Sequence, residues 1–173
     1  LDVRAGSRFV VTGTKCAFSL DESVYLRKHL AMHRSQSLAR ILHLSDLHFG
    51  PPFIAEVGQA VLRIAQHLDI DAIVVSGDFT QRAKEEQFQA AREFLDQLPD
   101  VPRLYVPGNH DVPLCRIRER FFDSHGLYKK FISPELNPVL FMDHAVIVGI
   151  DSSSPRTAIT NGRIHQWQLE TAE

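Results

Sequence analysis

Three short apolar runs recur along the chain at nearly equal intervals, and each is followed at once by side chains that bind metals or carry protons. Asp46, Asp78 and Asn109 follow the successive runs, about 30 residues apart, which is the length of one βαβ unit. Short apolar runs of this kind are typical of strands buried in a parallel sheet. The runs occupy residues 41–45, 73–76 and 104–106.

The segments between the runs predict two crossover helices. Apolar residues recur there at helical spacing, with polar residues between them. The first segment contains Ile54, Val57, Val61 and Ile64, and the second, from about residue 84 to 98, contains Phe88, Ala91, Leu95 and Leu98. Right-handed crossovers bring the loops that leave parallel strands to one edge of the sheet. We therefore predict an α/β fold whose three polar loops converge.

These loops carry three short motifs. They are D-x-H at 46–48, G-D at 77–78 and G-N-H-D at 108–111. Each motif alone is common, but their order and spacing resemble the calcineurin-like metallophosphoesterase superfamily. The stretches SGDFTQRAKEEQF and VPGNHDVPL are similar to the bacterial cyclic-nucleotide-phosphodiesterase-like branch, also called class III phosphodiesterases. This resemblance covers residues 41–111 and implies a metallophosphoesterase-type αββα sandwich.

The resemblance implies a centre of two divalent metal ions. Asp46 and His48 would bind the first ion, Asn109 would bind the second, and Asp78 would bridge both. Two cations lower the pKa of a shared water, so a metal-activated hydroxide would attack phosphorus without a nucleophilic side chain. Imidazole, carboxylate and amide ligands without thiolate are compatible with Mn, Fe, Zn or Co.

Three further residues are candidates for the reaction. His110 resembles the family residue that stabilises the transition state or protonates the leaving oxygen, a role suited to the imidazole pKa near 6.5. Asp111 is expected to orient the imidazole of His110 or that of His48. Arg116 is the cation nearest this loop, in a segment that predicts one broken helix over 114–132. We consider it a candidate for substrate phosphate, with an exposed helix face as the alternative.

The second half of the chain predicts two more strands, at 139–142 and 145–150, joined by a tight turn, and a helix from about residue 164. The remaining histidines in this part and earlier are expected to be structural. They are His43, His67, His125 and His144. His165 stands in a helix-like context and is not expected to replace a metal ligand.

Length, charge and hydropathy bear on the number of domains, the partners and the location of the protein. A chain of 173 residues with 44% hydrophobic residues is long enough for one domain with its own core. The formal net charge of −2 gives no sign of the basic surface that nucleic-acid binding requires. No apolar run is long enough for a membrane span. We therefore predict a cytoplasmic protein that acts on a small phosphoester, without a membrane or nucleic acid partner. The oligomeric state is left open.

Residues 1–39 have no counterpart in the family pattern. We interpret them as an N-terminal extension that precedes a metallophosphoesterase domain at 40–173, and we hypothesise that Met32 is the native start. His29 and His33 are spaced for a shared metal, but a solvated basic helix face is the preferred interpretation.

The family pattern continues with two later blocks that this sequence lacks. One is a histidine after a further strand, and the other is a final Gly-His-x-His; nothing after Asp151 matches either. We therefore expect the sandwich to be incomplete at the C-terminus, with metal affinity reduced. Two alternatives to a phosphodiesterase remain open: a metallophosphoesterase-type nuclease, and a non-catalytic truncated fragment or interaction module.

Overall fold

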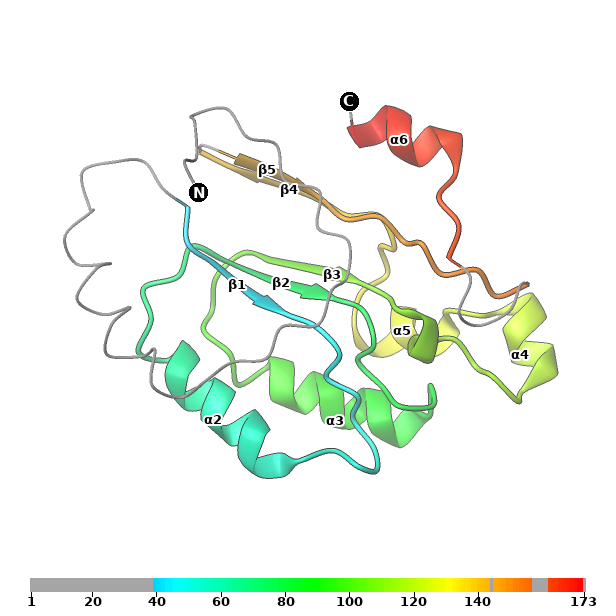
Figure 1. The fold of residues 1–173 in the computed structure, drawn as a ribbon, viewed down its shortest axis with the longest axis horizontal. Helices are drawn as coiled ribbons and strands as arrows, with labels where there is room; N and C mark the ends of the chain where they lie inside the picture. The colour runs from blue at the N-terminus through cyan, green and yellow to red at the C-terminus, as the bar shows by residue number, and fades with distance from the viewer. Residues whose placement is uncertain (1–38, 144, 157–161, 173) are drawn as a thin grey trace.

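A three-stranded parallel sheet lies at the centre of the computed structural model, which describes residues 39–143, 145–156 and 162–172. The strands β1 (Ile41–Leu44), β2 (Ala72–Ser76) and β3 (Arg103–Val106) are adjacent in chain order. Helices α2 (Ala55–Ala65) and α3 (Glu85–Leu95) make the two crossovers and lie on the same side of the sheet (Figure 1). The predicted α/β fold is confirmed.

A two-stranded antiparallel hairpin lies on the other side of this sheet. It consists of β4 (Val139–Met142) and β5 (Ala145–Val148), so the second strand ends slightly earlier than the sequence predicts. Ile147 packs against Val74 and Leu104 of the central sheet. Helices, parallel sheet and hairpin therefore form successive layers (Figure 1), an arrangement consistent with the metallophosphoesterase sandwich.

The segment after β3 contains three short helical elements. They are the 3₁₀ helix η1 (Asn109–Asp111), α4 (Ile117–Phe122) and α5 (Gly126–Phe131), and α6 (Gln166–Ala172) follows near the C-terminus. The predicted broken helix is confirmed, because α4 and α5 are separated at 123–125. Tyr128 of α5 is fully buried and contacts the ring of Phe79 with a centroid distance of 5.8 Å. This contact attaches α5 to the loop that leaves β2.

The main core lies between the sheet and its two helices. All four apolar positions predicted for the second helical segment are buried, from Phe88 to Leu98. The first helix differs from the prediction, because Val57 is 58% exposed and the buried positions include Gly58 and Leu62. An alanine Cβ at position 58 would lie 3.0 Å from the ring of Phe53. Aromatic side chains thus pack on this glycine and turn the valine side outward.

Three of the histidines that the sequence predicts to be structural have side-chain hydrogen bonds. His43 Nε2 lies 2.7 Å from Ser76 Oγ, and His67 Nδ1 lies 2.7 Å from the carbonyl oxygen of Arg63. His125 Nε2 lies 2.8 Å from Ser153 Oγ. His144 lies outside the described residues. His43 and His125 thereby connect segments that are distant in the sequence, whereas His67 bonds the last turn of α2.

His125 is expected to make the fold acid-sensitive. Burial lowers its pKa, although the charge of Asp151 acts in the opposite direction. Since the unfolded chain then binds the proton more tightly, the free energy of unfolding should fall as pH decreases below about 6.5. Urea unfolding across pH 5–8 should show a weaker dependence in His125→Gln than in the wild type. The control His67→Gln, at an exposed position, should keep the wild-type dependence of unfolding free energy on pH. The same dependence in His125→Gln as in the wild type would contradict the prediction.

The predictions on membrane spans and on the N-terminal extension concern residues that the structure describes only in part. None of the helices within 39–143, 145–156 and 162–172 is both long and apolar enough to cross a membrane. Residues 1–38 of the N-terminal extension lie outside the described residues, and with them the native start predicted at Met32 and the pair His29 and His33.

Candidate metal centre

The loops that leave β1 and β2 run side by side and continue the parallel pairing of their strands. The amide of Asp46 donates to the carbonyl of Gly77, and the amide of His48 donates to the carbonyl of Asp78 at 2.8 Å. Phe49 and Thr80 then form a parallel bridge. Backbone pairing therefore holds the D-x-H motif against the G-D motif.

Three of the predicted metal ligands have a left-handed backbone. The φ angles are 56° for Asp46, 49° for His48 and 53° for Asp78. Such conformations cost on the order of 1–3 kcal/mol each, although Asp and His adopt them more readily than most residues. Backbone strain at three polar residues on two paired loops is typical of a functional site, where the surrounding structure fixes the orientation of the side chains.

Two glycines allow the second and third loops to come into contact. Gly77 has a φ of +81°, and a Cβ on it would lie 3.0 Å from the Cα of Gly108. A Cβ on Gly108 would lie 2.2 Å from Oδ1 of Asp78 and 2.3 Å from its backbone nitrogen. The amide of His110 donates to the same Oδ1 at 3.0 Å. The third motif therefore closes directly over the Asp78 carboxylate.

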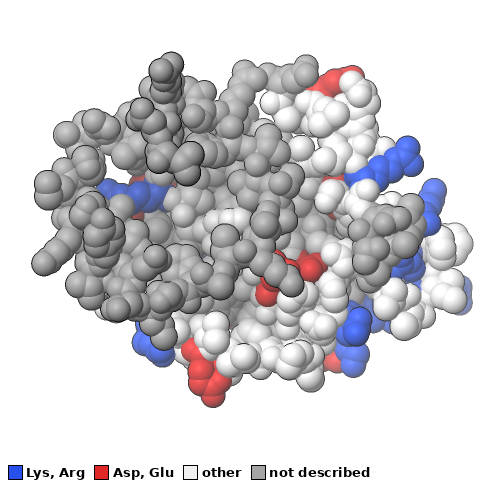
Figure 2. Space-filling model, in the orientation of Figure 1, with Lys and Arg blue, Asp and Glu red and all other residues white. Residues whose placement is uncertain are grey.

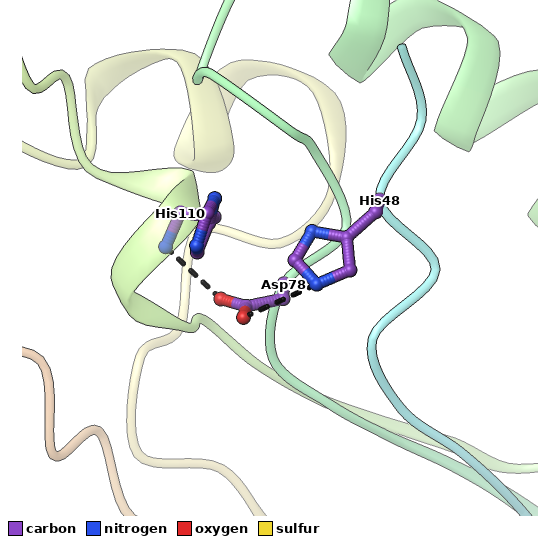
Figure 3. A group of neighbouring side chains, drawn as sticks. All are labelled: His48, Asp78 and His110. Carbon is purple, nitrogen blue, oxygen red and sulfur yellow. Dashed lines mark hydrogen bonds and ion pairs between the residues drawn. The ribbon is translucent and has the colours of Figure 1, made fainter. Parts of the chain in front are cut away.

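His48, Asp78 and His110 converge in the space between the loops (Figure 3). One ligand atom from each lies within 4.8 Å of the others. Nε2 of His48 is 3.6 Å from Oδ1 of Asp46 and 3.7 Å from Oδ2 of Asp78, longer than a normal hydrogen bond. Ligands bound tetrahedrally at about 2.1 Å from an ion lie roughly 3.4 Å apart. The donor set and its spacing fit a divalent metal ion.

Asn109 begins η1 directly before His110 and is partly buried. It reaches the same edge of the sheet as the cluster, so its amide remains a predicted ligand. The structure thus brings together Asp46, His48, Asp78 and His110, and it places Asn109 next to them in the chain.

The imidazole of His110 is held by a backbone carbonyl. Its Nδ1 lies 2.9 Å from the carbonyl oxygen of Gln81, and because that oxygen only accepts, Nδ1 carries a proton. The ring packs edge-on against that of His48, with centroids 4.8 Å apart. Nε2 is consequently the nitrogen of His110 that is left for a substrate or a metal.

Asp111 has different partners from the imidazoles that the sequence suggested. Its carboxylate accepts hydrogen bonds from the amides of Gly108, Phe79 and Thr80, and from the hydroxyl of Thr80. Burial raises the pKa of the Asp111 carboxyl to about 7, while these amide hydrogen bonds act to lower it. Asp111 therefore joins the loops after β2 and β3, and the Gln81 carbonyl contacts His110 in its place.

Removal of the Asp111 carboxylate should destabilise the domain. In Asp111→Ala three amides lose their acceptor in a buried site, so we expect the free energy of unfolding to fall by about 3 kcal/mol. Urea unfolding measures this change. The matched control Asp100→Ala removes an exposed carboxylate and should change stability by less than about 0.5 kcal/mol. Equal stability of the two variants would contradict the role of Asp111 in joining the loops after β2 and β3.

Arg116 lies at the rim of this region. Its guanidinium donates to the carbonyl of Ala83 at 2.7 Å and pairs with Glu119 at 2.7 Å, so it supports the loop after β2. Figure 2 shows positive side chains gathered along the edge of the molecule that carries α4. A positive rim attracts anionic ligands, and a direct contact of Arg116 with substrate remains a prediction.

Thr80 is a residue of the site that sequence inspection missed. Its side chain is fully buried, and its hydroxyl lies 3.1 Å from the carbonyl of His110 and accepts from the amide of Ala83 at 3.0 Å. A threonine that bonds a backbone amide three residues later is a common turn device. The signal was present in the stretch Asp78-Phe79-Thr80, but nothing in the sequence shows that Thr80 also reaches the third loop.

Comparison with known proteins agrees with this geometry. The family model described as calcineurin-like phosphoesterase matches residues 39–170. The chain belongs to the calcineurin-like phosphoesterase family. The resemblance inferred from the three motifs is thereby confirmed, and the match includes every residue assigned to the site.

Individual relatives of this chain are similar over shorter stretches. The glycerophosphodiester phosphodiesterase GpdQ of Enterobacter lignolyticus is 47% identical over 45 residues, 26% of this chain and 16% of that protein. A probable cyclic nucleotide phosphodiesterase of Colwellia psychrerythraea is 29% identical over 85 residues, which are 47% of this chain and 30% of that protein. A transmembrane protein with a metallophosphoesterase domain from Danio rerio is 27% identical over 127 residues, which are 68% of this chain and 28% of that protein. The matched segments thus span less than a third of each relative.

Proposed function

We propose that this phosphoesterase hydrolyses a phosphodiester with the help of two divalent metal ions. The observation that carries the proposal is the convergence of His48, Asp78 and His110 at the exits of three parallel strands. Asp46, His48 and Asp78 would hold one ion, and Asp78 and Asn109 the other. When bound, such ions lower the pKa of water and neutralise charge on the phosphate oxygens.

His110 would act on the leaving group. As an imidazolium it would donate the proton on Nε2 to the leaving oxygen, while a water that has released one proton to solvent forms a new O–P bond and the old P–O bond breaks. The imidazole would then return to the neutral form with its proton on Nδ1, which the Gln81 carbonyl favours. A positioned general acid of this kind supplies roughly a 10²- to 10⁴-fold acceleration.

The relatives and the sequence around the site together support a proposal for the substrate class. Two of the similar proteins are named as phosphodiesterases, one for glycerophosphodiesters and one for cyclic nucleotides. The stretches around Asp78 and Asn109 are those that resemble the cyclic-nucleotide branch. We therefore propose a small phosphodiester of the cyclic-nucleotide type, and a cytoplasmic protein, for the chain described here.

Hydrolysis of three substrates with added Mn²⁺ tests the proposal. We expect the wild type to release p-nitrophenol from bis(p-nitrophenyl) phosphate, and to act more slowly on p-nitrophenyl phosphate and on single-stranded DNA. For a dialkyl phosphodiester, whose leaving oxygen requires a proton, His110→Ala should lower kcat by about 100-fold or more, and the loss should be smaller for the p-nitrophenyl esters. His67→Gln serves as the control, since His67 is exposed and lies on the turn after α2.

The outcomes separate the alternatives. Preference for single-stranded DNA over the small diester would indicate a nuclease, and the positive rim near α4 would then contact the nucleic acid. Absence of all three activities would favour a non-catalytic module. Equal rates for the wild type and His110→Ala on the dialkyl phosphodiester would contradict the role given to His110.

A further inference from the structure

A single peptide group connects His110 to helix α3. The carbonyl of Gln81 contacts Nδ1 of His110 at 2.9 Å, and the amide of Arg82 belongs to the same peptide. That amide donates to Oε1 of Gln87 at 2.8 Å. Because the peptide group is planar and trans, its C=O and N–H point in opposite directions. The peptide is thus held between the Gln87 side chain on one side and the imidazole on the other.

Gln87 is placed to hold this peptide firmly. Its side chain is buried, with 7% of the residue exposed, although it belongs to the first turn of α3. Oε1 also lies 3.5 Å from the amide of Lys84. On the other side, a Cβ at Gly50 would lie 2.2 Å from Nε2 of Gln87, so the carboxamide packs directly on the end of the D-x-H loop. One buried carboxamide therefore touches two of the three loops that carry the predicted metal ligands.

The surrounding turn has little freedom of its own. Ala83 has a left-handed backbone with a φ of 50°, its amide donates to Thr80 Oγ1, and its carbonyl accepts from Arg116. The amide of Gln81 donates to the carbonyl of Phe49 at 3.0 Å. These contacts fix the ends of the turn, whereas the orientation of the 81–82 peptide itself depends on Gln87.

We propose that Gln87 is a positioning residue for His110. Its side-chain oxygen orients the 81–82 peptide, whose carbonyl keeps a proton on Nδ1 of His110 and leaves Nε2 as the nitrogen that exchanges a proton with substrate. Hydrogen bonds in series through one peptide strengthen each other, because each polarises the next. The effect on rate rests on the proposed function, but the effect on the imidazole does not.

Two variants of the full chain separate this role from simple packing. Gln87→Met removes the acceptor at nearly constant length, and Gln87→Glu keeps an oxygen acceptor. Long-range ¹H–¹⁵N spectra at about pH 8 report which nitrogen of His110 carries the proton in the metal-free chain. We expect Nδ1–H in the wild type and in Gln87→Glu, and a mixture of both tautomers in Gln87→Met.

Kinetics provide the second measurement. With Mn²⁺ added, Gln87→Met should lower kcat about tenfold for a dialkyl phosphodiester, whose leaving oxygen requires a proton, and less for bis(p-nitrophenyl) phosphate. KM should change by less than about twofold, since no substrate contact is lost, and Gln87→Glu should recover most of kcat for the dialkyl substrate.

Each result decides the proposal. A folded Gln87→Met chain with only the Nδ1–H tautomer of His110 overturns it. If Gln87→Met does not fold, Gln87→Glu decides, because an Nε2–H tautomer there equally overturns the proposal and retained Nδ1–H supports it. If the wild type hydrolyses no phosphodiester, the proposed function fails, and the tautomer spectra still test the hydrogen-bond relay.

Discussion

Asp78→Ala is expected to abolish the activity and nearly all metal binding. The carboxylate of Asp78 lies between the loops after β1 and β3, close to Nε2 of His48 and bonded to the amide of His110. It would serve both ions, so its loss should reduce kcat/KM for bis(p-nitrophenyl) phosphate by at least roughly 1,000-fold. Calorimetric titration with Mn²⁺, together with the hydrolysis rate, measures both effects.

A carboxylate elsewhere on the chain provides the control for Asp78. Asp143 is exposed in the turn between β4 and β5, so Asp143→Ala should bind Mn²⁺ and hydrolyse the substrate as the wild type does. Wild-type Mn²⁺ affinity in Asp78→Ala would show that the ion binds somewhere other than the three loops.

Gly108→Ala is expected to disrupt the site and to destabilise the fold. The added methyl group would lie 2.3 Å from the backbone nitrogen of Asp78 and 2.2 Å from its Oδ1. Backbone cannot rotate away as a side chain does, so the loops after β2 and β3 must separate. Overpacking of this kind costs about 1–3 kcal/mol or more, and we expect Mn²⁺ binding to be lost with it.

Gly58→Ala is the matched control for Gly108. Its methyl group would first meet the ring of Phe53 at 3.0 Å, and that partly exposed side chain is able to shift. Alanine also favours helix over glycine by roughly 0.5–1 kcal/mol. Urea unfolding should therefore leave Gly58→Ala close to the wild type and Gly108→Ala well below it. Similar midpoints for both variants would contradict the close contact at Gly108.

The order of strands and the convergence of their loops could be predicted from the sequence. Spacing of about 30 residues between Asp46, Asp78 and Asn109, with helical periodicity between them, permits few other arrangements. Apolar runs at the predicted positions form β1, β2 and β3, paired in parallel. The position of the predicted ligands at the strand ends follows from this topology.

Contacts between distant residues could not be predicted in the same way. The sequence identified Asp111 as an acidic neighbour of His110, but its acceptor capacity is taken by amides after both β2 and β3. The buried face of α2 was likewise set by the aromatic rings of Phe53 and Phe94, which pack on Gly58. Periodicity detects a helix, whereas the face that is buried depends on what the rest of the chain brings to it.

The amount of Mn²⁺ bound by the wild-type chain at equilibrium tests the central claim most directly. After dialysis against Mn²⁺ and analysis of the metal content, we predict at least one ion per chain, two if both proposed positions fill, and none in Asp78→Ala. A wild-type chain that binds no Mn²⁺, and neither Zn²⁺ nor Co²⁺ in the same measurement, would contradict the assignment of Asp46, His48, Asp78 and Asn109 to a metal centre.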